Sequence, residues 1–281
     1  MQQSYEFGRN WRTFIDGHLD DERIAEAVRS LQAFVGLHSL DGKTFLDIGC
    51  GSGLFSLAAH RMGAARIVSL DVDPDSVACT RELHAREGAP ASWEVLHGSV
   101  LDESFMASLG EFDVVYSWGV LHHTGSMWVA IENAARAVRR GGLLYIAIYN
   151  RADGIGLHSD GRVGSSRVWE AEKRFYNRLP EWGKRVMDYS AAAGMVGAYL
   201  VAGRNPIREI RSHKSMRGMS WMVDIRDWLG GYPYEYASVS EVFHFMKEKT
   251  GFSLESLRST NSLRCNEYLF RRVDGATTRD G

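Results

Sequence analysis

The sequence contains few cysteines and no long hydrophobic run. Its three cysteines, Cys50, Cys79 and Cys265, lie far apart without paired metal-ligand spacing, so we expect reduced structural thiols and no bound metal. No stretch of 18 or more apolar residues could cross a bilayer, and the first residues lack the hydrophobic segment of a signal peptide. We therefore expect a soluble cytoplasmic protein with no membrane partner.

An excess of positive charge is also absent. The chain has 33 lysines and arginines against 35 aspartates and glutamates, which gives a formal net charge of −2. This balance disfavours a nucleic-acid partner, because such proteins usually carry a basic face. A length of 281 residues suits one large domain, or a core domain with a helical addition. The composition leaves the oligomeric state open, a homo-oligomer included.

The chain alternates between strand-like and helix-like segments. The short β-rich runs KTFLDIG, ARIVSLDVD, SWEVLHGSV, FDVVYSWG and GLLYIAIYN are separated by helix-like stretches, and FSLESLRST and CNEYLFRRV follow near the end. This alternation predicts right-handed crossovers and an α/β fold with a doubly wound, mostly parallel seven-stranded sheet. We expect the following blocks: an N-terminal helical lid (1–40), the core (41–150), a helical and aromatic cover (151–240), a last helix and strand pair (241–273) and a tail (274–281).

Two aspartates are placed to begin helices. Asp20 precedes a segment in which apolar residues recur at helical spacing, and Asp73 stands directly before Pro74. Aspartate is a favoured N-cap residue, and proline is favoured at the first helical position. We therefore predict that both side chains cap helices.

A glycine-rich turn follows the first predicted strand of the core. Gly49, Gly51 and Gly53 form the pattern GxGxG, whereas a dinucleotide fingerprint has GxGxxG and would need a third glycine at Leu54. Asp71 ends the next predicted strand about twenty residues later, where a carboxylate can accept both hydroxyls of a ribose. We infer a ligand that has an adenosine-like ribose but no pyrophosphate.

These motifs resemble a known family. DIGCGSG followed by LDVDP is similar to the S-adenosylmethionine (AdoMet) site of class I, Rossmann-like methyltransferases. The resemblance covers Lys43 to Asn150 and, more weakly, Phe252 to Val273. The whole chain also resembles bacterial methyltransferase-domain proteins. The family implies AdoMet as cofactor and S-adenosylhomocysteine as product. Compact relatives have a short connection where this chain has Arg151 to Ser240, directly after the fifth strand, so we expect a helical insertion that covers the active site.

The resemblance also assigns cofactor contacts. It implies that Asp47 holds the methionine end, that Asp71 binds the ribose and that Val72 lies against the adenine. Many relatives have aspartate where this chain has Ser99, so Asp102 or a backbone carbonyl is expected to take over its contact. The full set of implied cofactor residues is Asp47, Gly49, Gly51, Gly53, Asp71, Val72, Ser99, Val100, Ser117, Trp118 and, in the N-terminal segment, Trp11.

Two adjacent histidines are the candidate catalytic residues. His122 and His123 follow the fourth core strand, where the family's substrate meets the methyl group, and a neutral imidazole could remove an acceptor proton. Alternatively, a histidine there packs under the sheet edge and bonds to the backbone. Adjacent histidines cannot easily both face one ion, so we expect no metal. Tyr149 and Asn150, at the end of the fifth strand, are candidate substrate contacts.

The predicted cover holds the other candidate acceptor residues. Arg217 lies in an arginine-rich segment and Tyr234 in the aromatic segment DWLGGYPYEYAS. An arginine can grip a carboxylate or phosphate, and clustered aromatic rings can enclose a ring or a cation. A solvated helix face and ordinary packing remain the competing explanations for these residues.

The sequence thus predicts an AdoMet-dependent methyltransferase. We expect in-line transfer of a methyl group to an oxygen, nitrogen or sulfur nucleophile of a small-molecule acceptor. An RNA or protein acceptor is the alternative, with the arginine-rich segment as the docking surface. An AdoMet-binding sensor without catalytic activity is the alternative from another functional class.

Overall fold

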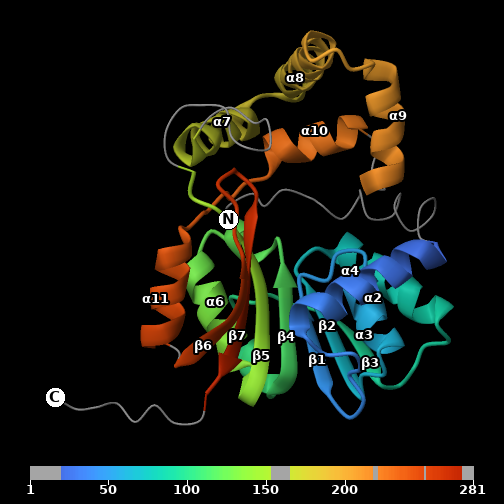
Figure 1. The fold of residues 1–281 in the computed structure, drawn as a ribbon, viewed down its shortest axis with the longest axis vertical. Coiled ribbons are helices and arrows are strands. Elements are labelled where there is room, and N and C mark those ends of the chain that lie inside the picture. The colour runs from blue at the N-terminus through green and yellow to red at the C-terminus, as the bar shows by residue number, and fades with distance from the viewer. Residues whose placement is uncertain (1–19, 153–164, 218–220, 250, 274–281) are drawn as a thin grey trace.

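The computed structural model describes residues 20–152, 165–217, 221–249 and 251–273. Its central feature is one seven-stranded sheet (Figure 1). The strands are β1 (Thr44–Ile48), β2 (Arg66–Asp71), β3 (Trp93–His97), β4 (Phe112–Trp118), β5 (Val138–Tyr149), β6 (Phe252–Arg258) and β7 (Cys265–Arg272).

The strand order is β3-β2-β1-β4-β5-β7-β6. The strands from β1 to β5 pair in parallel, and β7 runs antiparallel to both β5 and β6. The predicted doubly wound, mostly parallel sheet is therefore confirmed. The chain builds outward from β1 in one direction to β3 and in the other to β5, and ligands of such sheets bind where the order reverses.

Helices cover both faces of the sheet, and alternating strand residues face the two layers. In β5, Leu143 and Tyr145 belong to one buried cluster, while Leu144 and Ile146 belong to the other. The first layer contains α2 (Asp21–Val35), α3 (Leu54–Arg61) and α4 (Pro74–Arg86), and the second contains α5 (Glu103–Ser108), α6 (Met127–Arg136) and α11 (Val239–Lys249).

The two predicted helix caps are confirmed. The Asp20 carboxylate accepts from the backbone N–H of Arg23 at 2.9 Å and begins α2. The Asp73 carboxylate accepts from the backbone N–H of Asp75 at 2.9 Å, with Pro74 as the first residue of α4. Both acids satisfy helix donors that would otherwise lack a partner.

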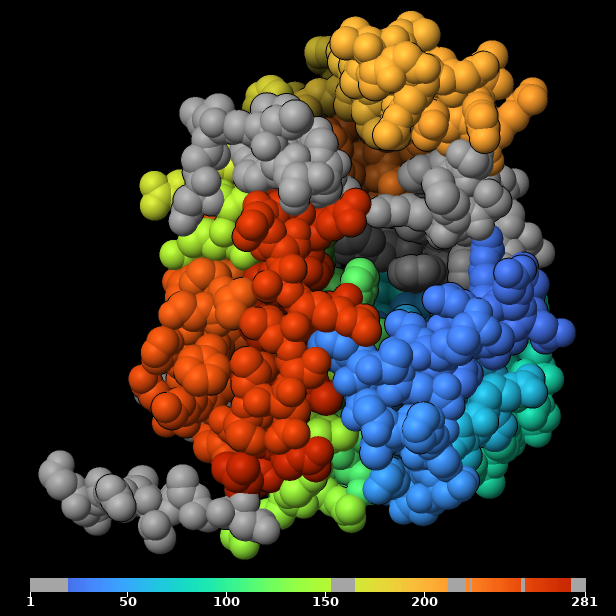
Figure 2. All heavy atoms as spheres, viewed as in Figure 1, coloured from blue at the N-terminus to red at the C-terminus, as the bar shows by residue number. Residues whose placement is uncertain are grey.

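The remaining helices form a cover at the end of the sheet where the parallel strands finish (Figure 1). The space-filling view shows the yellow and orange atoms of this cover above the core (Figure 2). The cover has a small apolar cluster of its own, which includes Tyr176, Trp221, Ile225 and Leu229. Its helices are α7 (Ser166–Arg178), α8 (Glu181–Val201), α9 (Pro206–Arg217) and α10 (Trp221–Gly230). None of the described helices is both long and apolar enough to cross a membrane.

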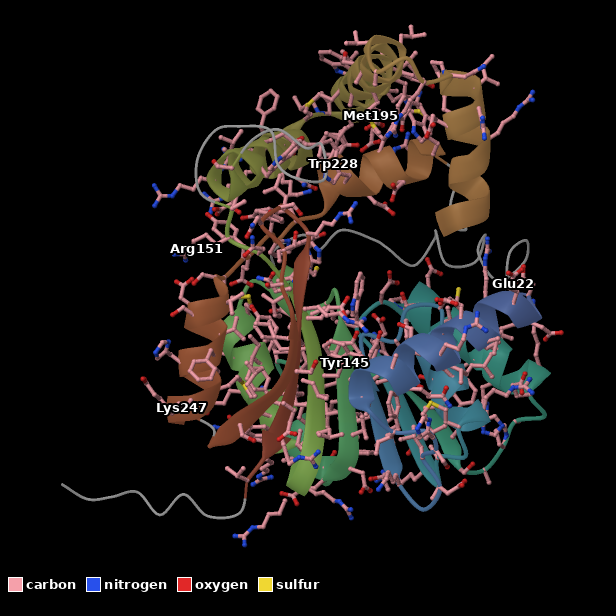
Figure 3. The ribbon with its side chains drawn as sticks, in the orientation of Figure 1. Glu22, Tyr145, Arg151, Met195, Trp228 and Lys247 are labelled. Atoms are coloured by element: carbon pink, nitrogen blue, oxygen red, sulfur yellow. The ribbon has the colours of Figure 1, made fainter. Side chains whose placement is uncertain are left out.

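The chain enters and leaves the cover at one place. The backbone N–H of Ala237 donates to the carbonyl of Tyr149 at 3.0 Å, and the N–H of Arg151 donates to the carbonyl of Ala237 at 3.1 Å. Figure 3 shows Arg151 at this junction between core and cover. The insertion is therefore anchored at both of its ends to the carboxyl end of β5.

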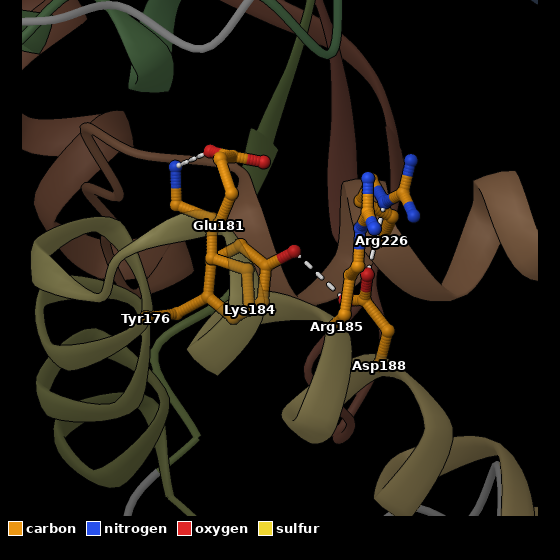
Figure 4. Close-up of a pocket in the computed structure, with 6 residues that line it drawn as sticks. All are labelled: Tyr176, Glu181, Lys184, Arg185, Asp188 and Arg226. Atoms are coloured by element: carbon orange, nitrogen blue, oxygen red, sulfur yellow. Dashed lines mark hydrogen bonds and ion pairs between the residues drawn. The ribbon is translucent and has the colours of Figure 1, made fainter.

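A buried carboxylate joins three helices of the cover. Asp188 of α8, with 1% of its side chain exposed, accepts from the Tyr176 hydroxyl at 2.7 Å and from Arg226 Nε at 3.0 Å. These residues line a small polar pocket (Figure 4), whose other lining residues are Glu181, Lys184 and Arg185.

We predict that Asp188→Ala destabilises the protein by about 1–3 kcal/mol, because it leaves the Tyr176 hydroxyl buried without an acceptor. Urea unfolding monitored by circular dichroism measures this change. Glu181→Ala is the matched control, because that carboxylate pairs only with Lys184 among the described residues and is 79% exposed. Such a surface pair contributes at most about 1 kcal/mol. Equal loss of stability in the two variants would show that the buried hydrogen bonds of Asp188 contribute no more than an exposed ion pair.

Candidate active site

Two acids lie at the carboxyl ends of neighbouring strands. Asp47 is in β1 and Asp71 ends β2. The loop between β1 and α3 bends across β2, because the N–H groups of Gly49 and Cys50 both donate to the carbonyl of Leu70, at 2.8 and 3.0 Å. The N–H of Gly51 then donates to Asp71 Oδ2 at 3.0 Å. The loop thereby fixes one acid and lies directly beside the other.

The glycines of this loop are required by backbone shape and packing. Gly49, Gly51 and Gly53 have φ values of 75°, 54° and 79°, which favour glycine. A Cβ at Gly49 would lie 2.4 Å from Val120, and one at Gly53 would lie 2.9 Å from Thr80. Backbone conformation and packing therefore explain why glycine stands at these two positions without any ligand. Their contacts with the cofactor stay predictions.

Asp47 is a buried acid with a polar connection behind it. It is 2% exposed, and its Oδ2 accepts from the Ser56 hydroxyl at 2.6 Å. The Ser56 oxygen lies 2.6 Å from that of Ser69, which accepts from the Trp93 indole N–H at 2.8 Å. Burial raises the pKa of Asp47 to about 7, the Ser56 hydroxyl opposes this rise, and the charge of Asp71 adds to it.

Asp71 presents a carboxylate next to an exposed apolar surface. Its oxygens accept from the N–H groups of Gly51 and Asp73, at 3.0 and 2.9 Å. Burial raises its pKa above the ordinary value, and these two hydrogen bonds oppose the rise. Val72 follows with 59% of its surface exposed. A fixed carboxylate beside an exposed aliphatic side chain suits a ligand that joins a diol to a flat apolar ring.

The residues after β3 are largely occupied by local contacts. Ser99 Oγ accepts from the N–H of Leu101 at 3.2 Å. Val100 is 5% exposed, and its carbonyl accepts from an Asn133 side chain at 2.9 Å. Asp102 caps α5 by accepting from the N–H of Phe105 at 2.9 Å. Asp102 therefore caps a helix, and its adenine contact stays a prediction.

The last residues of β4 differ in exposure. Ser117 is fully buried, and its hydroxyl donates to the carbonyl of Ile48 in β1 at 3.0 Å. Trp118 is 47% exposed. Of the two residues assigned to the cofactor here, only Trp118 has an exposed side chain, while Ser117 links the two central strands.

The two histidines form the short helix η1 (Leu121–His123) directly after β4. Nδ1 of the fully buried His122 lies 3.3 Å from the N–H of Tyr149. A backbone N–H can only donate, so the neutral ring carries its proton on Nε2, which has no hydrogen-bond partner within the described residues. Nδ1 of His123 lies 2.6 Å from the carbonyl of Pro233 and therefore donates to it.

Both histidines are held neutral near pH 7. Burial lowers the pKa of His122, with the neighbouring His123 as the next cause. Burial also lowers the pKa of His123, to about 4. Both rings are weak bases because their protonated forms are disfavoured.

Aromatic rings connect the histidines to the exit of the cover. The Tyr149 ring centroid lies 4.0 Å from that of His122 and 5.1 Å from that of Tyr234. Tyr234 is 5% exposed, and the N–H of the next residue, Glu235, donates to the carbonyl of His122 at 2.9 Å. The segment that leaves the cover is thus packed directly on the histidine pair, and Tyr149 and Tyr234 come together as candidate substrate contacts.

Asn150 has a structural role in this arrangement. Its side-chain nitrogen donates to the carbonyl of Ser262 at 3.0 Å, and its oxygen accepts from Asn266 at 2.9 Å. It is 7% exposed, so the expected substrate contact receives no support from its surroundings. Trp11 and the side chain of Arg217 lie outside the described residues. Within the described ranges, no three histidine, cysteine, aspartate or glutamate residues gather as metal ligands.

Lys173 of α7 was not predicted from the sequence. This lysine is 4% exposed, donates to the carbonyl of Trp228, and places Nζ 5.3 Å from the Tyr234 ring centroid. Its charge contributes to the lowered pKa of both His122 and His123. Helical spacing places Lys173 on the same helix face as Trp169 and Tyr176. This was the feature of the sequence that could have identified it.

We predict a pH-dependent cost of the buried Asp47 charge in the ligand-free protein. The folded pKa is about 7 and the ordinary value is 3.8, so the folded state binds the proton more tightly than the unfolded chain. The contribution of Asp47 to stability therefore falls as pH rises between these values, by up to about 1.4 kcal/mol per pH unit.

Asp47→Asn carries no such charge. The unfolding free energy of this variant minus that of the wild type should rise with pH from about 4 to about 7 and then level off, because Asp47 no longer titrates there. Urea titrations of ligand-free protein at several pH values measure this difference. A difference that stays constant across this range would contradict the assignment.

Part of the sequence is similar to known methyltransferases. Residues 46–146 match the family described as "Methyltransferase domain". A ubiquinone biosynthesis O-methyltransferase of Rhizobium rhizogenes is 34% identical over 113 residues, which are 40% of this chain and 43% of that protein. A ribosomal protein L11 methyltransferase of Pectobacterium carotovorum is 42% identical over 65 residues, which are 23% of this chain and 22% of that protein. The chain thus matches less than half the length of either curated relative.

A solved structure extends the likeness in fold. The magnesium protoporphyrin IX methyltransferase of Synechocystis is 14% identical, and the alignment covers 94% of this chain and 93% of that one with a TM-score of 0.51. At this identity the likeness concerns the fold alone. Residues 46–146 thus match a methyltransferase domain, and the seven-stranded sheet with its flanking helices has the class I methyltransferase fold.

Proposed function

We propose that this protein is an AdoMet-dependent methyltransferase that transfers a methyl group in line to an oxygen, nitrogen or sulfur nucleophile of a small molecule. One observation carries the proposal. Asp47 and Asp71 lie at the ends of adjacent parallel strands, with the glycine loop between them, inside the segment that matches a methyltransferase domain.

The residues present fit the chemical groups of AdoMet. The backbone-held Asp71 suits a ribose diol, and the exposed side chain of Val72 suits an adenine face. Asp47 supplies a carboxylate for the ammonium group of the methionine end. AdoMet, when bound, supplies a methyl group activated on a sulfonium. The protein then has to orient a nucleophile and remove its proton where necessary.

The acceptor half of the site favours orientation over strong base catalysis. The fully buried His122 accepts from the N–H of Tyr149 and is held neutral, so it supports the position of Tyr149 and does not act as a strong base. The lowered pKa of His123, about 4, makes it a weak base. A nucleophile with an available lone pair, such as an unprotonated amine or a thiolate, therefore needs least from these residues.

The cover supports a small acceptor. Its exit segment packs on the histidines through Tyr234 and Glu235, so the acceptor end is enclosed by the chain itself. The two curated relatives named above differ in acceptor, because one methylates in ubiquinone biosynthesis and the other acts on a ribosomal protein. A macromolecular acceptor is therefore the alternative.

The function is tested by label transfer. Purified protein and methyl-labelled AdoMet are added to an extract of the source cells, which is then separated into small-molecule, RNA and protein fractions. We expect label in the small-molecule fraction. Asp71→Ala should abolish most of it, since charge-assisted hydrogen bonds of this kind contribute about 1.5–3 kcal/mol to binding.

Other outcomes of this experiment reject the proposal or part of it. Label in RNA or protein would show that the acceptor is a macromolecule and not a small molecule. AdoMet binding without labelled product in any fraction would favour a sensor, and the absence of both binding and label would refute the cofactor assignment.

A pH profile checks the role of His123. With the labelled acceptor and saturating AdoMet, the turnover should show no inflection near pH 6.5, because burial has moved the pKa of His123 to about 4. His123→Asn, whose amide can still donate to Pro233, should lower turnover without changing the shape of the profile. A wild-type inflection near 6.5 that disappears in this variant would show His123 to be a conventional base.

A further inference from the structure

We propose that Ser56, Ser69 and Trp93 form a hydrogen-bond relay that keeps Asp47 ionised for the ammonium group of the cofactor's methionine end. The proposal rests on the proposed function, because it assigns a task to the AdoMet site. It goes further by naming three positioning residues that do not themselves contact the cofactor.

The relay links one helix and three strands. The Trp93 indole of β3 donates to Ser69 of β2 at 2.8 Å. The Ser69 and Ser56 oxygens are 2.6 Å apart, and the Ser56 hydroxyl of α3 donates to Asp47 Oδ2 at 2.6 Å. All four residues are at most 2% exposed. Water therefore cannot easily replace any member of the relay.

The two ends of the relay determine its direction. An indole N–H can only donate, and an ionised carboxylate can only accept. The single hydroxyl hydrogen of Ser56 is used on Asp47, so Ser69 must donate to Ser56 and accept from Trp93. With Asp47 ionised, three hydrogens fill the three contacts from Trp93 to Asp47.

Protonation of Asp47 disturbs this arrangement. A proton on Oδ2 would leave four hydrogens for the same three contacts. A proton on the other oxygen would convert the bond from Ser56 into a neutral one, and charge-assisted bonds are about twice as strong. Either way the relay favours the carboxylate form.

The other ionisable groups around Asp47 do not stabilise its charge. Asp71 of β2 raises the pKa of Asp47. Cys50 in the loop and Tyr116 of β4 both have pKa values raised well above their usual range, chiefly by burial. They are therefore neutral near pH 7, and no cation is among the causes that lower the pKa of Asp47. Within the described residues, the stabilisation of its charge comes from Ser56.

The test compares two ligands by isothermal titration calorimetry between pH 5.5 and 8.5. S-adenosylhomocysteine has the ammonium group, whereas 5′-methylthioadenosine shares the adenosine and thioether but lacks the amino-acid end. For Ser56→Ala we expect about tenfold weaker binding of S-adenosylhomocysteine at pH 7, because a hydrogen bond to a charged group is lost. Affinity for S-adenosylhomocysteine should fall as the pH is lowered and Asp47 becomes protonated. In Ser56→Ala, the pH at which this affinity is half of its maximum should be higher than in the wild type, and binding of 5′-methylthioadenosine should be unchanged.

Two further variants separate the relay from general disruption. Trp93→Phe keeps an aromatic ring but removes the first donor, and it should produce a smaller upward shift of the same kind. Thr80→Val is the control, because Thr80 is also fully buried and donates to the carbonyl of Gly51 at 3.1 Å but takes no part in the relay. It should affect both ligands alike and leave the pH profile in place.

The outcomes distinguish the relay from the proposed function. If Ser56→Ala weakens both ligands equally without a pH shift, Ser56 is merely structural and the relay is refuted. If folded wild-type protein binds neither ligand, the AdoMet site itself is refuted and the relay loses its task. Upward pH shifts in Ser56→Ala and Trp93→Phe, but not in Thr80→Val, would establish the relay.

Discussion

Parallel pairing of the central strands is the constraint on which the site depends. Because β1 pairs with β2 and β4, and β4 with β5, four carboxyl ends meet at one edge of the sheet. That edge carries Asp47, Asp71, Trp118 and Tyr149, residues that lie far apart in the sequence. Reversal of the strand order beside β1 leaves this edge accessible to a ligand. The cofactor and acceptor halves of the site are therefore consequences of one sheet topology.

The buried charge of Asp47 is the main cost of this arrangement. Placing a carboxylate among packed strands is unfavourable unless hydrogen bonds compensate, and its pKa of about 7 shows that the compensation is incomplete. A cofactor ammonium would complete it. The ligand-free protein thus stores a penalty that a cationic ligand removes, and this penalty favours that ligand over a neutral analogue of similar shape. Selectivity for the methionine end can in this way arise from one acid and its supporting hydroxyl.

Local signals made the core predictable, whereas cross-strand contacts were hidden. Asp20 and Asp73 were identified as caps because a cap depends on residues only a few positions away. The glycine loop was found for the same reason. Ser69 lies in a buried strand, and nothing local shows that β3 places the Trp93 indole beside it. The buried state of Lys173 likewise depends on α10, which follows about fifty residues later. Such contacts depend on register and helix packing, which a single sequence specifies only indirectly.

The two halves of the site are built from different parts of the chain. The described residues of the proposed cofactor half lie within residues 46–146, which match a methyltransferase domain. The proposed acceptor residues Tyr149 and Tyr234, with Lys173 beside them, follow that segment and belong to β5 and the cover. Both ends of the insertion are hydrogen-bonded at the end of β5, so its sequence can change while the sheet edge stays fixed. A change in the exit segment would alter the packing on the histidines without moving Asp47 or Asp71. Acceptor choice should therefore follow the insertion, and the acceptors of relatives that match only the shared domain say little about the acceptor of this protein.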